Sequence, residues 1–427
     1  MRVRIHRGAH EIGGSCVEVE HDGQRIVLDV GRPLTADRGD QAPLPDIAGL
    51  GPADPEDEST IGVLISHHHA DHWGLVDQIR AGLPIYMGAA TQRILKAAAF
   101  WTWGLDVPVA GHLEHRVPFD LGPFTITPYI NDHSAFDAYS LLVEADGERL
   151  FYSGDIRGHG RKQAVFEELV NDPPTDVNVL LLEGTNIQPG LPPKPMMTET
   201  AVEHAMTEQF NSTDGMALVV SSAQNIDRLV TIYRATLRAD RDLVMDPYTA
   251  AIARATGYDT IPRPHPDWPR IHTYMPRWQA VRIKQHEAFD RLDDINPYRL
   301  FPEDLAKDPS RYVLLYSNDE GRRLADEGAL DGATCTWSLW AGYLDAPSGQ
   351  RLKQFLAEHH IPLIQHHTSG HASVEDLRRL ADAIDADVVV PIHTFGADDY
   401  DQLSDRVTAR PDGEWWDVGA DVPRGRP

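Results

Sequence analysis

The sequence predicts an α/β fold, because short apolar runs alternate with segments of helical periodicity. Buried strands of α/β proteins read as continuous apolar runs, and their functional residues lie at the carboxyl ends. Three such runs stand directly before residues that can bind a metal or a proton: 61–66 before a histidine cluster, 179–182 before Glu183 and 388–392 before His393. We therefore expect strands here, with functional side chains at one edge of a sheet.

Helical patterns lie between the predicted strands. Thr198 can cap a helix whose apolar positions include Val202, Met206 and Phe210. Residues 226–237 show the same period and precede a short apolar strand at 243–245. Ser373, with an aspartate three residues later, can open a helix that runs to about Ala383. Strands that alternate with helices complete the α/β prediction.

Two segments share one plan of a strand, an Asp-Gly pair and a second strand. They are residues 17–29 and 141–152. Asp-Gly between β-rich runs favours a type I′ hairpin, which needs positive φ at both turn residues. The likeness is open to two interpretations: two related halves of one sheet-containing domain, or the chance occurrence of a common hairpin.

Composition excludes several classes of protein. The chain has 427 residues, with 39 Lys and Arg against 65 Asp and Glu, and a net charge of −26. Such a charge argues against a general nucleic-acid coat, because phosphate contacts need cations. Two cysteines exclude a disulfide framework. No signal-peptide or membrane-spanning pattern is present in the sequence, so we expect a soluble, cytoplasmic protein with no membrane partner.

The strongest functional signal is the motif His-x-His-x-Asp-His at residues 67–72, directly after a predicted strand. Imidazole and carboxylate groups hold Zn²⁺ or Mn²⁺ in proteins. His67 and His69 can point the same way and bind one metal, and Asp71 and His72 can face a second. A solvated histidine run is the alternative, but it would not interleave aspartate at the end of a buried strand. His68 faces the other way, toward solvent or packing.

This motif resembles that of the metallo-β-lactamase superfamily, and further residues follow in the order that the resemblance implies. It implies an αββα sandwich that holds two divalent metal ions, with Zn²⁺ expected and Mn²⁺ as the alternative. The first metal would be bound by His67, His69, His133 and Asp155. The second would be bound by Asp71, His72, His393 and the shared Asp155. Asp29 would match the family's aspartate that supports a ligand without touching the metal.

A long insertion before the last ligand resembles the layout of the β-CASP nuclease branch, which includes RNase J. Far more chain separates Asp155 from His393 than a single crossover needs. The implied domains are 1–191, the first part of the metallo-β-lactamase domain; 192–364, the inserted α/β β-CASP domain; and 365–427, which completes the first. The active site is expected in the cleft between the two domains.

Three segments resemble sequence motifs of that branch. Residues 181–186 resemble its acidic motif A, with Glu183 as the acid, and residues 368–373 resemble motif B, with His371 as the catalytic histidine. His393 occupies motif C, where histidine is associated with members that act on RNA. These matches imply a nuclease that acts on RNA.

The residues of these motifs have compatible chemical roles. Ser369 and Gly370, before a helix capped by Ser373, can offer backbone N–H groups and a hydroxyl to a phosphate. His371 can donate to the scissile phosphate or to the leaving oxygen, and Glu183 can hold its tautomer. With Asp71, these two form the expected catalytic set. Two adjacent metals favour hydrolysis over redox chemistry or group transfer.

We therefore expect a two-metal phosphodiester hydrolase of RNase J type that acts on single-stranded RNA in a local cleft. The alternatives are a hydrolase of a small ester, thioester or phosphodiester, and a non-catalytic partner subunit of an RNA-processing complex. Any self-association is expected to give a dimer. One stretch, 263–299, combines cations with aromatics and can hold RNA, or can be a solvated helix face. Packing at the domain interface is favoured for Trp337, Trp340 and Tyr343, although they could border the cleft.

Overall fold

The chain folds into two compact units in a computed structural model, which describes residues 1–36, 42–52, 56–102, 104–317 and 321–419. Unit 1 consists of Met1–Leu95, Leu105–Met196 and Gly370–Pro427. Unit 2 consists of Lys96–Gly104 and Met197–Ser369. The segment 96–104 belongs to unit 2, although no sequence signal distinguishes it from the residues around it.

Unit 1 contains two sheets. The first is seven-stranded, in the order β19 (Trp415–Asp417), β1 (Arg2–Arg7), β2 (Cys16–His21), β3 (Gln24–Leu28), β4 (Thr60–Leu64), β5 (Ile85–Gly88) and β6 (Gly111–Leu113). The second is six-stranded, in the order β18 (Val388–Ile392), β11 (Val179–Glu183), β10 (Glu148–Tyr152), β9 (Ala138–Ala145), β8 (Phe124–Asn131) and β7 (Phe119–Leu121). Segments far apart in the chain therefore lie side by side in both sheets.

Each sheet contains one of the two predicted hairpins. Asp22 and Gly23 join β2 to β3 with φ of 50° and 77°, and Asp146 and Gly147 join β9 to β10 with φ of 48° and 81°. Positive φ at both turn residues is the type I′ geometry that Asp-Gly favours. The hairpin prediction is confirmed.

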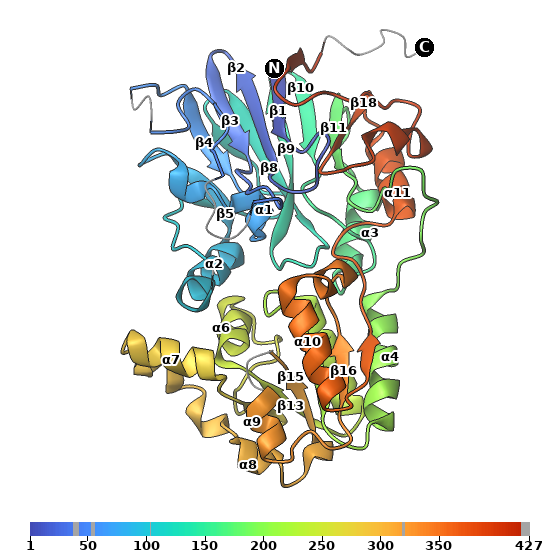
Figure 1. The fold of residues 1–427 in the computed structure, drawn as a ribbon. Helices are drawn as coiled ribbons and strands as arrows, with labels where there is room; N and C mark the ends of the chain where they lie inside the picture. Colours follow the sequence, from blue (N-terminus) through green and yellow to red (C-terminus); the bar gives the residue numbers. More distant parts are fainter. Residues whose placement is uncertain (37–41, 53–55, 103, 318–320, 420–427) are drawn as a thin grey trace. The chain divides into compact units, whose positions relative to one another are not determined.

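The helices of unit 1 are α1 (Ala70–Trp73), α3 (Gln163–Asn171), α11 (Val374–Ile384) and the first part of α2 (Ala89–Trp101), whose end belongs to unit 2 (Figure 1). Apolar side chains of β1–β4 and of β8–β11 and β18 pack together as one core between the sheets. On the other face of the second sheet, α3 and α11 bury Phe166 and Leu380 against Leu180 and Val389. The predicted α/β fold, with helices outside a pair of sheets, is confirmed.

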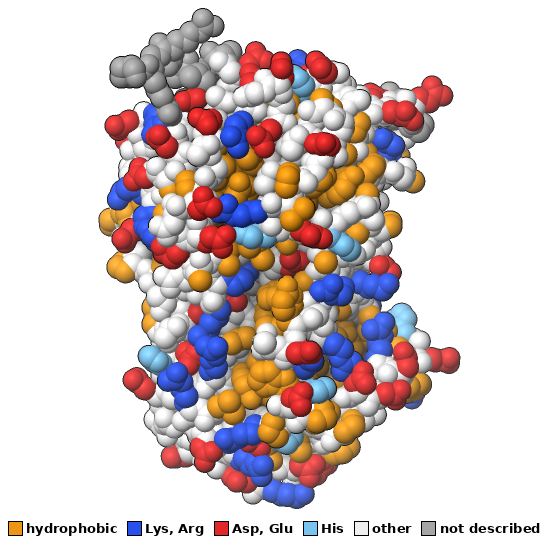
Figure 2. Space-filling model, turned by 180° about the vertical axis from the view of Figure 1, so that it is seen from behind, with side chains coloured by type: hydrophobic (Ala, Val, Ile, Leu, Met, Phe, Trp, Pro, Cys, Tyr) orange, Lys and Arg blue, Asp and Glu red, His pale blue; other side chains and the backbone are white. Residues whose placement is uncertain are grey.

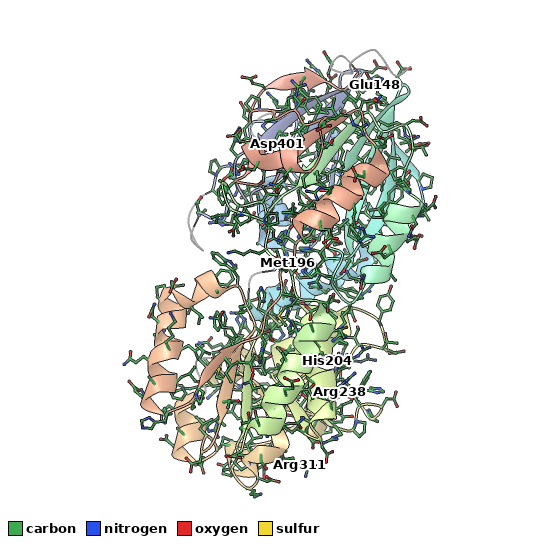
Figure 3. The ribbon with its side chains drawn as sticks, turned by 90° about the vertical axis from the view of Figure 1, so that its right-hand side faces the viewer. Glu148, Met196, His204, Arg238, Arg311 and Asp401 are labelled. Atoms are coloured by element: carbon green, nitrogen blue, oxygen red, sulfur yellow. The ribbon has the colours of Figure 1, made fainter. Side chains whose placement is uncertain are left out.

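Unit 2 is built on one parallel sheet, in the order β14 (Ile271–Thr273), β13 (Asp242–Met245), β15 (Tyr312–Leu315), β12 (Ala217–Val220), β16 (Thr334–Trp337) and β17 (Leu363–Gln365). Its helices are α4 (Glu199–Ser212), α5 (Ile226–Arg238), α6 (Pro247–Ala255), α7 (Arg277–Gln285), α8 (Pro302–Leu305), α9 (Gly321–Asp326) and α10 (Pro347–Glu358). Figure 3 shows α4 and α5 side by side, marked by His204 and Arg238. Arg238 Nε lies 2.9 Å from Glu203 Oε1 and joins these two helices.

The basic and aromatic stretch 263–299 forms contacts within unit 2. Arg270 pairs with Asp242 at 2.8 Å, and Arg263 pairs with Asp259 at 2.5 Å. On the face in Figure 2, Lys and Arg side chains are interspersed with Asp and Glu. These contacts favour the interpretation of a solvated, internally paired surface over that of a basic channel. No helix in the described ranges is both long and apolar enough to cross a membrane.

Thr198 is the N-cap of α4, as predicted from the sequence, and its Oγ1 accepts the N–H of Ala201 at 3.0 Å. We expect Thr198→Ala to lower the free energy of unfolding by about 1 kcal/mol, because one N–H of the first turn loses its acceptor. Thr198→Ser keeps the acceptor and should match the wild type. Urea unfolding of the three proteins tests this, and equal midpoints for Thr198→Ala and wild type would contradict it.

Candidate active site

Strand ends in unit 1 deliver the predicted site residues to one place. His67 follows β4, His133 follows β8, Asp155 follows β10, Glu183 ends β11 and His393 follows β18. The motif after β4 continues into the short helix α1, which contains Asp71 and His72. Because functional groups gather at the carboxyl ends of strands, residues distant in sequence become neighbours here.

The first cluster consists of the four residues that the sequence assigns to one metal. His67, His69, His133 and Asp155 each offer one ligand atom, and these four atoms lie within 4.8 Å of one another. His67 Nε2 lies 3.6 Å from Asp155 Oδ2, and His133 Nε2 lies 3.9 Å from the same oxygen. Three imidazoles and a carboxylate at such spacing are a donor set suited to a divalent transition metal.

The second cluster adjoins the first. Asp71, His72 and His393 also offer atoms within 4.8 Å of one another. Asp155 faces both clusters: its Oδ2 lies 3.2 Å from His72 Nε2, and its Oδ1 lies 3.9 Å from His393 Nε2. The structure therefore brings all seven predicted ligands together, with Asp155 between the two groups.

Five of the converging atoms are buried and make no hydrogen bond among the residues that the structure describes. They are Nε2 of His67, His72 and His393, and both carboxylate oxygens of Asp155. A buried polar atom without a partner costs about 1–3 kcal/mol, so such groups are rare in native proteins. Several of them pointing at one another fit divalent cations, which would satisfy all of them at once.

Electrostatics in the first cluster favour the protonation states that a cation needs. Burial lowers the pKa of His67 and of His133 well below the usual imidazole value. Burial would raise the pKa of Asp155, but His393 and His72 hold it well below its usual range. Neutral imidazoles and an ionised carboxylate are the forms that bind metal.

Asp29 is the anchor of this arrangement. Its Oδ1 accepts the N–H of Ser66 at 2.7 Å, and its Oδ2 lies within 2.8 Å of Ser66 Oγ and His72 Nδ1. Tyr152 donates its hydroxyl to the same oxygen at 2.7 Å. These bonds fix the orientation of His72 and of the chain just before His67. A carboxylate behind a ligating histidine sets its tautomer and ring orientation.

His393 has supports that the sequence did not indicate. Ser15 Oγ lies 2.8 Å from His393 Nδ1, and Gly13 N–H donates to the same nitrogen at 3.4 Å. His393 has φ of 53° and Asp29 has φ of 59°, in the left-handed region that ordinary residues rarely adopt. Strained backbone of this kind gathers at functional sites, where the surrounding structure maintains it.

His371 and Glu183 lie beside the second cluster. His371 Nδ1 is 3.5 Å from Glu183 Oε1 and 3.7 Å from Asp155 Oδ2. Burial alone would lower the pKa of His371, but Asp155 and Glu183 raise it to about 9. Glu183 is itself held by the N–H groups of Thr185 at 2.9 Å and Ala372 at 3.2 Å. His371 and Glu183 are thus adjacent, as predicted, and backbone N–H groups hold the Glu183 carboxylate in place.

The segment predicted to bind phosphate, Ser369 to Ser373, approaches the first cluster at Gly370. A Cβ on Gly370 would come within 2.4 Å of Ser134 Oγ and 3.4 Å of His133 Cε1, so only glycine allows this approach. Ser373 is the N-cap of α11, where its Oγ accepts the N–H of Asp376 at 3.0 Å. Ser369 belongs to unit 2 and Gly370 to unit 1, so the segment joins the two units along the chain.

A buried ion pair that the sequence analysis did not predict joins the chain next to His133 to the chain next to Asp155. Arg157 and Asp132 are both fully buried, with Nε 3.3 Å from Oδ1. Asp132 precedes His133, and Arg157 is two residues after Asp155. Neither residue belongs to a recognisable short motif, so their pairing across two strand ends could not be read from the chain. His68 is buried and accepts the N–H of Phe136 at 3.1 Å, in agreement with a packing role.

Comparison with known proteins finds a family model that matches part of the chain. Residues 43–221 match the family model described as the beta-lactamase superfamily domain. A solved protein of unknown function from Enterococcus faecalis V583 has the same fold, with a TM-score of 0.77 over 97% of this chain and 99% of that one, at 19% identity.

Curated relatives are named as ribonucleases. The chain is 25% identical over 226 residues to an RNase J-like protein of Methanocaldococcus jannaschii, covering 49% of this chain and 48% of that protein. It is 22% identical over 408 residues to ribonuclease J of Helicobacter pylori strain B128, covering 90% of this chain and 55% of that protein. The chain spans about half the length of these two relatives.

The bonds of Asp29 generate a prediction about metal affinity. We expect Asp29→Asn to weaken divalent metal binding roughly 10- to 100-fold, because His72 loses the carboxylate that orients it. Tyr152→Phe removes one donor and keeps the carboxylate, so it should have a smaller effect. Competition with a metal-binding dye measures both affinities. Wild-type affinity in Asp29→Asn would show that the hydrogen bonds to Asp29 do not support the site.

Proposed function

We propose that the chain, whose residues 43–221 match the beta-lactamase superfamily domain, is a two-metal phosphodiester hydrolase that acts on single-stranded RNA. The observation that carries the proposal is the convergence of two ligand groups on Asp155, which faces both. Paired metal sites are typical of enzymes that displace an oxygen at phosphorus. The named ribonucleases among the relatives support RNA as the substrate.

In this proposal the two clusters have separate tasks. His67, His69 and His133 would hold one ion, Asp71, His72 and His393 would hold the other, and Asp155 would touch both. Divalent cations, Zn²⁺ or Mn²⁺, would polarise a phosphoryl oxygen and make water nucleophilic at neutral pH. The buried atoms described above supply the nitrogen and oxygen donors that either ion accepts.

His371 would contact the substrate, and Glu183 would orient His371. We assign to His371 a hydrogen bond to the scissile phosphate or a proton for the leaving oxygen. Glu183 would keep the imidazole oriented, since its Oε1 lies 3.5 Å from His371 Nδ1. Asn186 donates its side-chain amide to the backbone oxygen of His371 at 3.0 Å and so restrains the same residue. The N-terminus of α11, with Ser369 and Gly370 before it, would accept a phosphate.

The net charge of −26 constrains how RNA is bound. A protein with this charge repels a polyanion at long range, which disfavours sequence-independent electrostatic binding along the surface as the main source of affinity. Binding would have to come from a local site, with metal ions and a few positioned groups. We therefore assign the activity to RNA ends or short single-stranded segments.

The activity itself is the most direct test. Purified metal-loaded protein should hydrolyse single-stranded RNA, and Asp71→Ala should lose this activity because it removes a ligand of the second cluster. Oligonucleotides with a 5′-phosphate or a 5′-hydroxyl separate exonuclease from endonuclease action. If the protein hydrolyses a lactone or thioester but leaves RNA intact, its substrate is a small molecule and the proposal of an RNA substrate is wrong. Metal-loaded protein inert toward all of these would contradict an enzymatic role.

A second variant separates catalysis from metal binding. We expect His371→Ala to lower kcat/KM for RNA roughly 10²- to 10⁴-fold, the range for loss of a general acid or base. Its metal content, measured by elemental analysis, should remain that of the wild type, because His67, His72 and the other proposed ligands are intact. Loss of metal together with activity would show that His371 is a ligand instead.

A further inference from the structure

Two aromatic side chains of unit 2 are exposed on one turn. Trp340 and Tyr343 expose 63% and 53% of their surface, whereas Trp337, three residues earlier, exposes 5% and packs in the core. The sequence favours packing at the domain interface for all three, and within unit 2 Trp337 is the one that is buried. An indole in water forgoes the burial that normally makes it a core or interface residue. Tryptophan and tyrosine side chains are enriched at binding interfaces, so this exposed pair is a candidate binding surface.

The exposed indole is held in place. Trp337 Nε1 donates to Trp340 O at 3.3 Å, and Tyr343 N–H donates to the same oxygen at 3.1 Å. The Trp340 ring lies against Gly342, where an added Cβ would come within 2.2 Å of it. The rings of Trp340 and Tyr343 meet edge to face, with centroids 5.4 Å apart. A surface aromatic fixed this way loses little conformational entropy when a ligand binds.

The turn is anchored to a buried ion pair at its first residue. Arg228 Nη1 donates to Ser338 O at 3.1 Å, and Arg228 Nη2 lies 2.9 Å from Glu199 Oε1. Both charged side chains are almost fully buried. Ser338 in turn donates its hydroxyl to the backbone oxygen of His366 at 2.6 Å. The ion pair therefore holds the aromatic turn and, through Ser338, the backbone at His366. His371 follows five residues later in the chain.

This location is the ligand-binding edge of an open α/β sheet. The turn follows β16, and His366 follows β17, so both lie at the carboxyl ends of parallel strands. Ligands of such sheets bind outside these ends. Trp340 and Tyr343 lie beside the exposed Ala341 and Asp345, and two aromatic side chains alone are too little surface for a protein–protein interface.

We propose that Trp340 and Tyr343 form a stacking platform for an unpaired nucleobase of single-stranded RNA. This rests on the proposed function and deepens it, because it explains how an acidic protein gains affinity for RNA. Base–aromatic stacking needs no net positive charge and accepts every base, since each base has a flat face. Arg263 and Arg270 are engaged with carboxylates, and stacking supplies affinity that does not depend on such cations.

The test is a double-mutant cycle in which the indole of Trp340 and one base of the RNA are removed separately and together. Wild-type holoenzyme and Trp340→Ala are titrated with short single-stranded phosphorothioate RNA, labelled with fluorescein, and with the same strand carrying one abasic nucleotide at successive positions. We expect Trp340→Ala to bind roughly 5- to 150-fold more weakly, the equivalent of one base–aromatic stack. When the abasic nucleotide replaces the base that stacks on the platform, wild type and Trp340→Ala should bind equally, because neither can form the stack.

Three further variants separate stacking from structure. Trp340→Phe keeps a flat ring and should bind within a few-fold of wild type. Gly342→Ala keeps both aromatics but displaces the indole, so it should bind as weakly as Trp340→Ala. Phe289→Ala removes another exposed aromatic of unit 2, 56% exposed, and should bind as wild type. Hydrolysis of bis(p-nitrophenyl) phosphate, which has no nucleobase, should be unchanged in all of them, whereas KM for RNA rises in Trp340→Ala.

The outcomes for the platform and for the activity are distinct. Wild-type affinity in Trp340→Ala, an equal loss with every abasic strand, or no RNA binding by the wild type overturns the platform. If the wild type binds RNA through Trp340 but does not cut it, the proposed activity fails and the platform stands. If the wild type cuts RNA and Trp340→Ala cuts it with unchanged KM, the activity stands and the platform fails.

Discussion

The buried carboxylate of Asp155, between two groups of imidazoles, is the constraint on which the site depends. Its two oxygens face His72 and His393 at 3.2 and 3.9 Å and make no hydrogen bond to a described residue. Such an arrangement is costly without a cation, because each of these buried atoms has lost its water and has no hydrogen-bond partner in its place. Cations remove that cost, so the fold has assembled a site whose stability and chemistry depend on the same ions.

Much of the fold and of the ligand set could be predicted because the relevant signals are local. The apolar runs before His67 and His393, the Asp-Gly turns and the cap at Thr198 each require only a few neighbouring residues. The ligand order followed from a resemblance, and the structure brings those side chains together. Strand ends explain why residues from distant parts of the chain meet, since parallel neighbours such as β11 and β18 end at the same edge.

The residues that were missed act through partners far away in the sequence. Ser15 supports His393, and Arg157 pairs with Asp132, but no pattern near either residue indicates these contacts. The aromatic turn shows a second limit. Trp337 and Trp340 have the same apolar character, and only the three-dimensional path of the chain decides that one is buried and the other exposed. Periodicity over so short a turn carries no such information.

Anomalous X-ray scattering at the metal absorption edge of metal-loaded crystals tests the central claim most directly. The account predicts two peaks about 3.5–4 Å apart on either side of Asp155. One should lie among His67, His69 and His133, and the other among Asp71, His72 and His393. A lack of anomalous signal at these side chains, or metal bound only elsewhere on the chain, would contradict it.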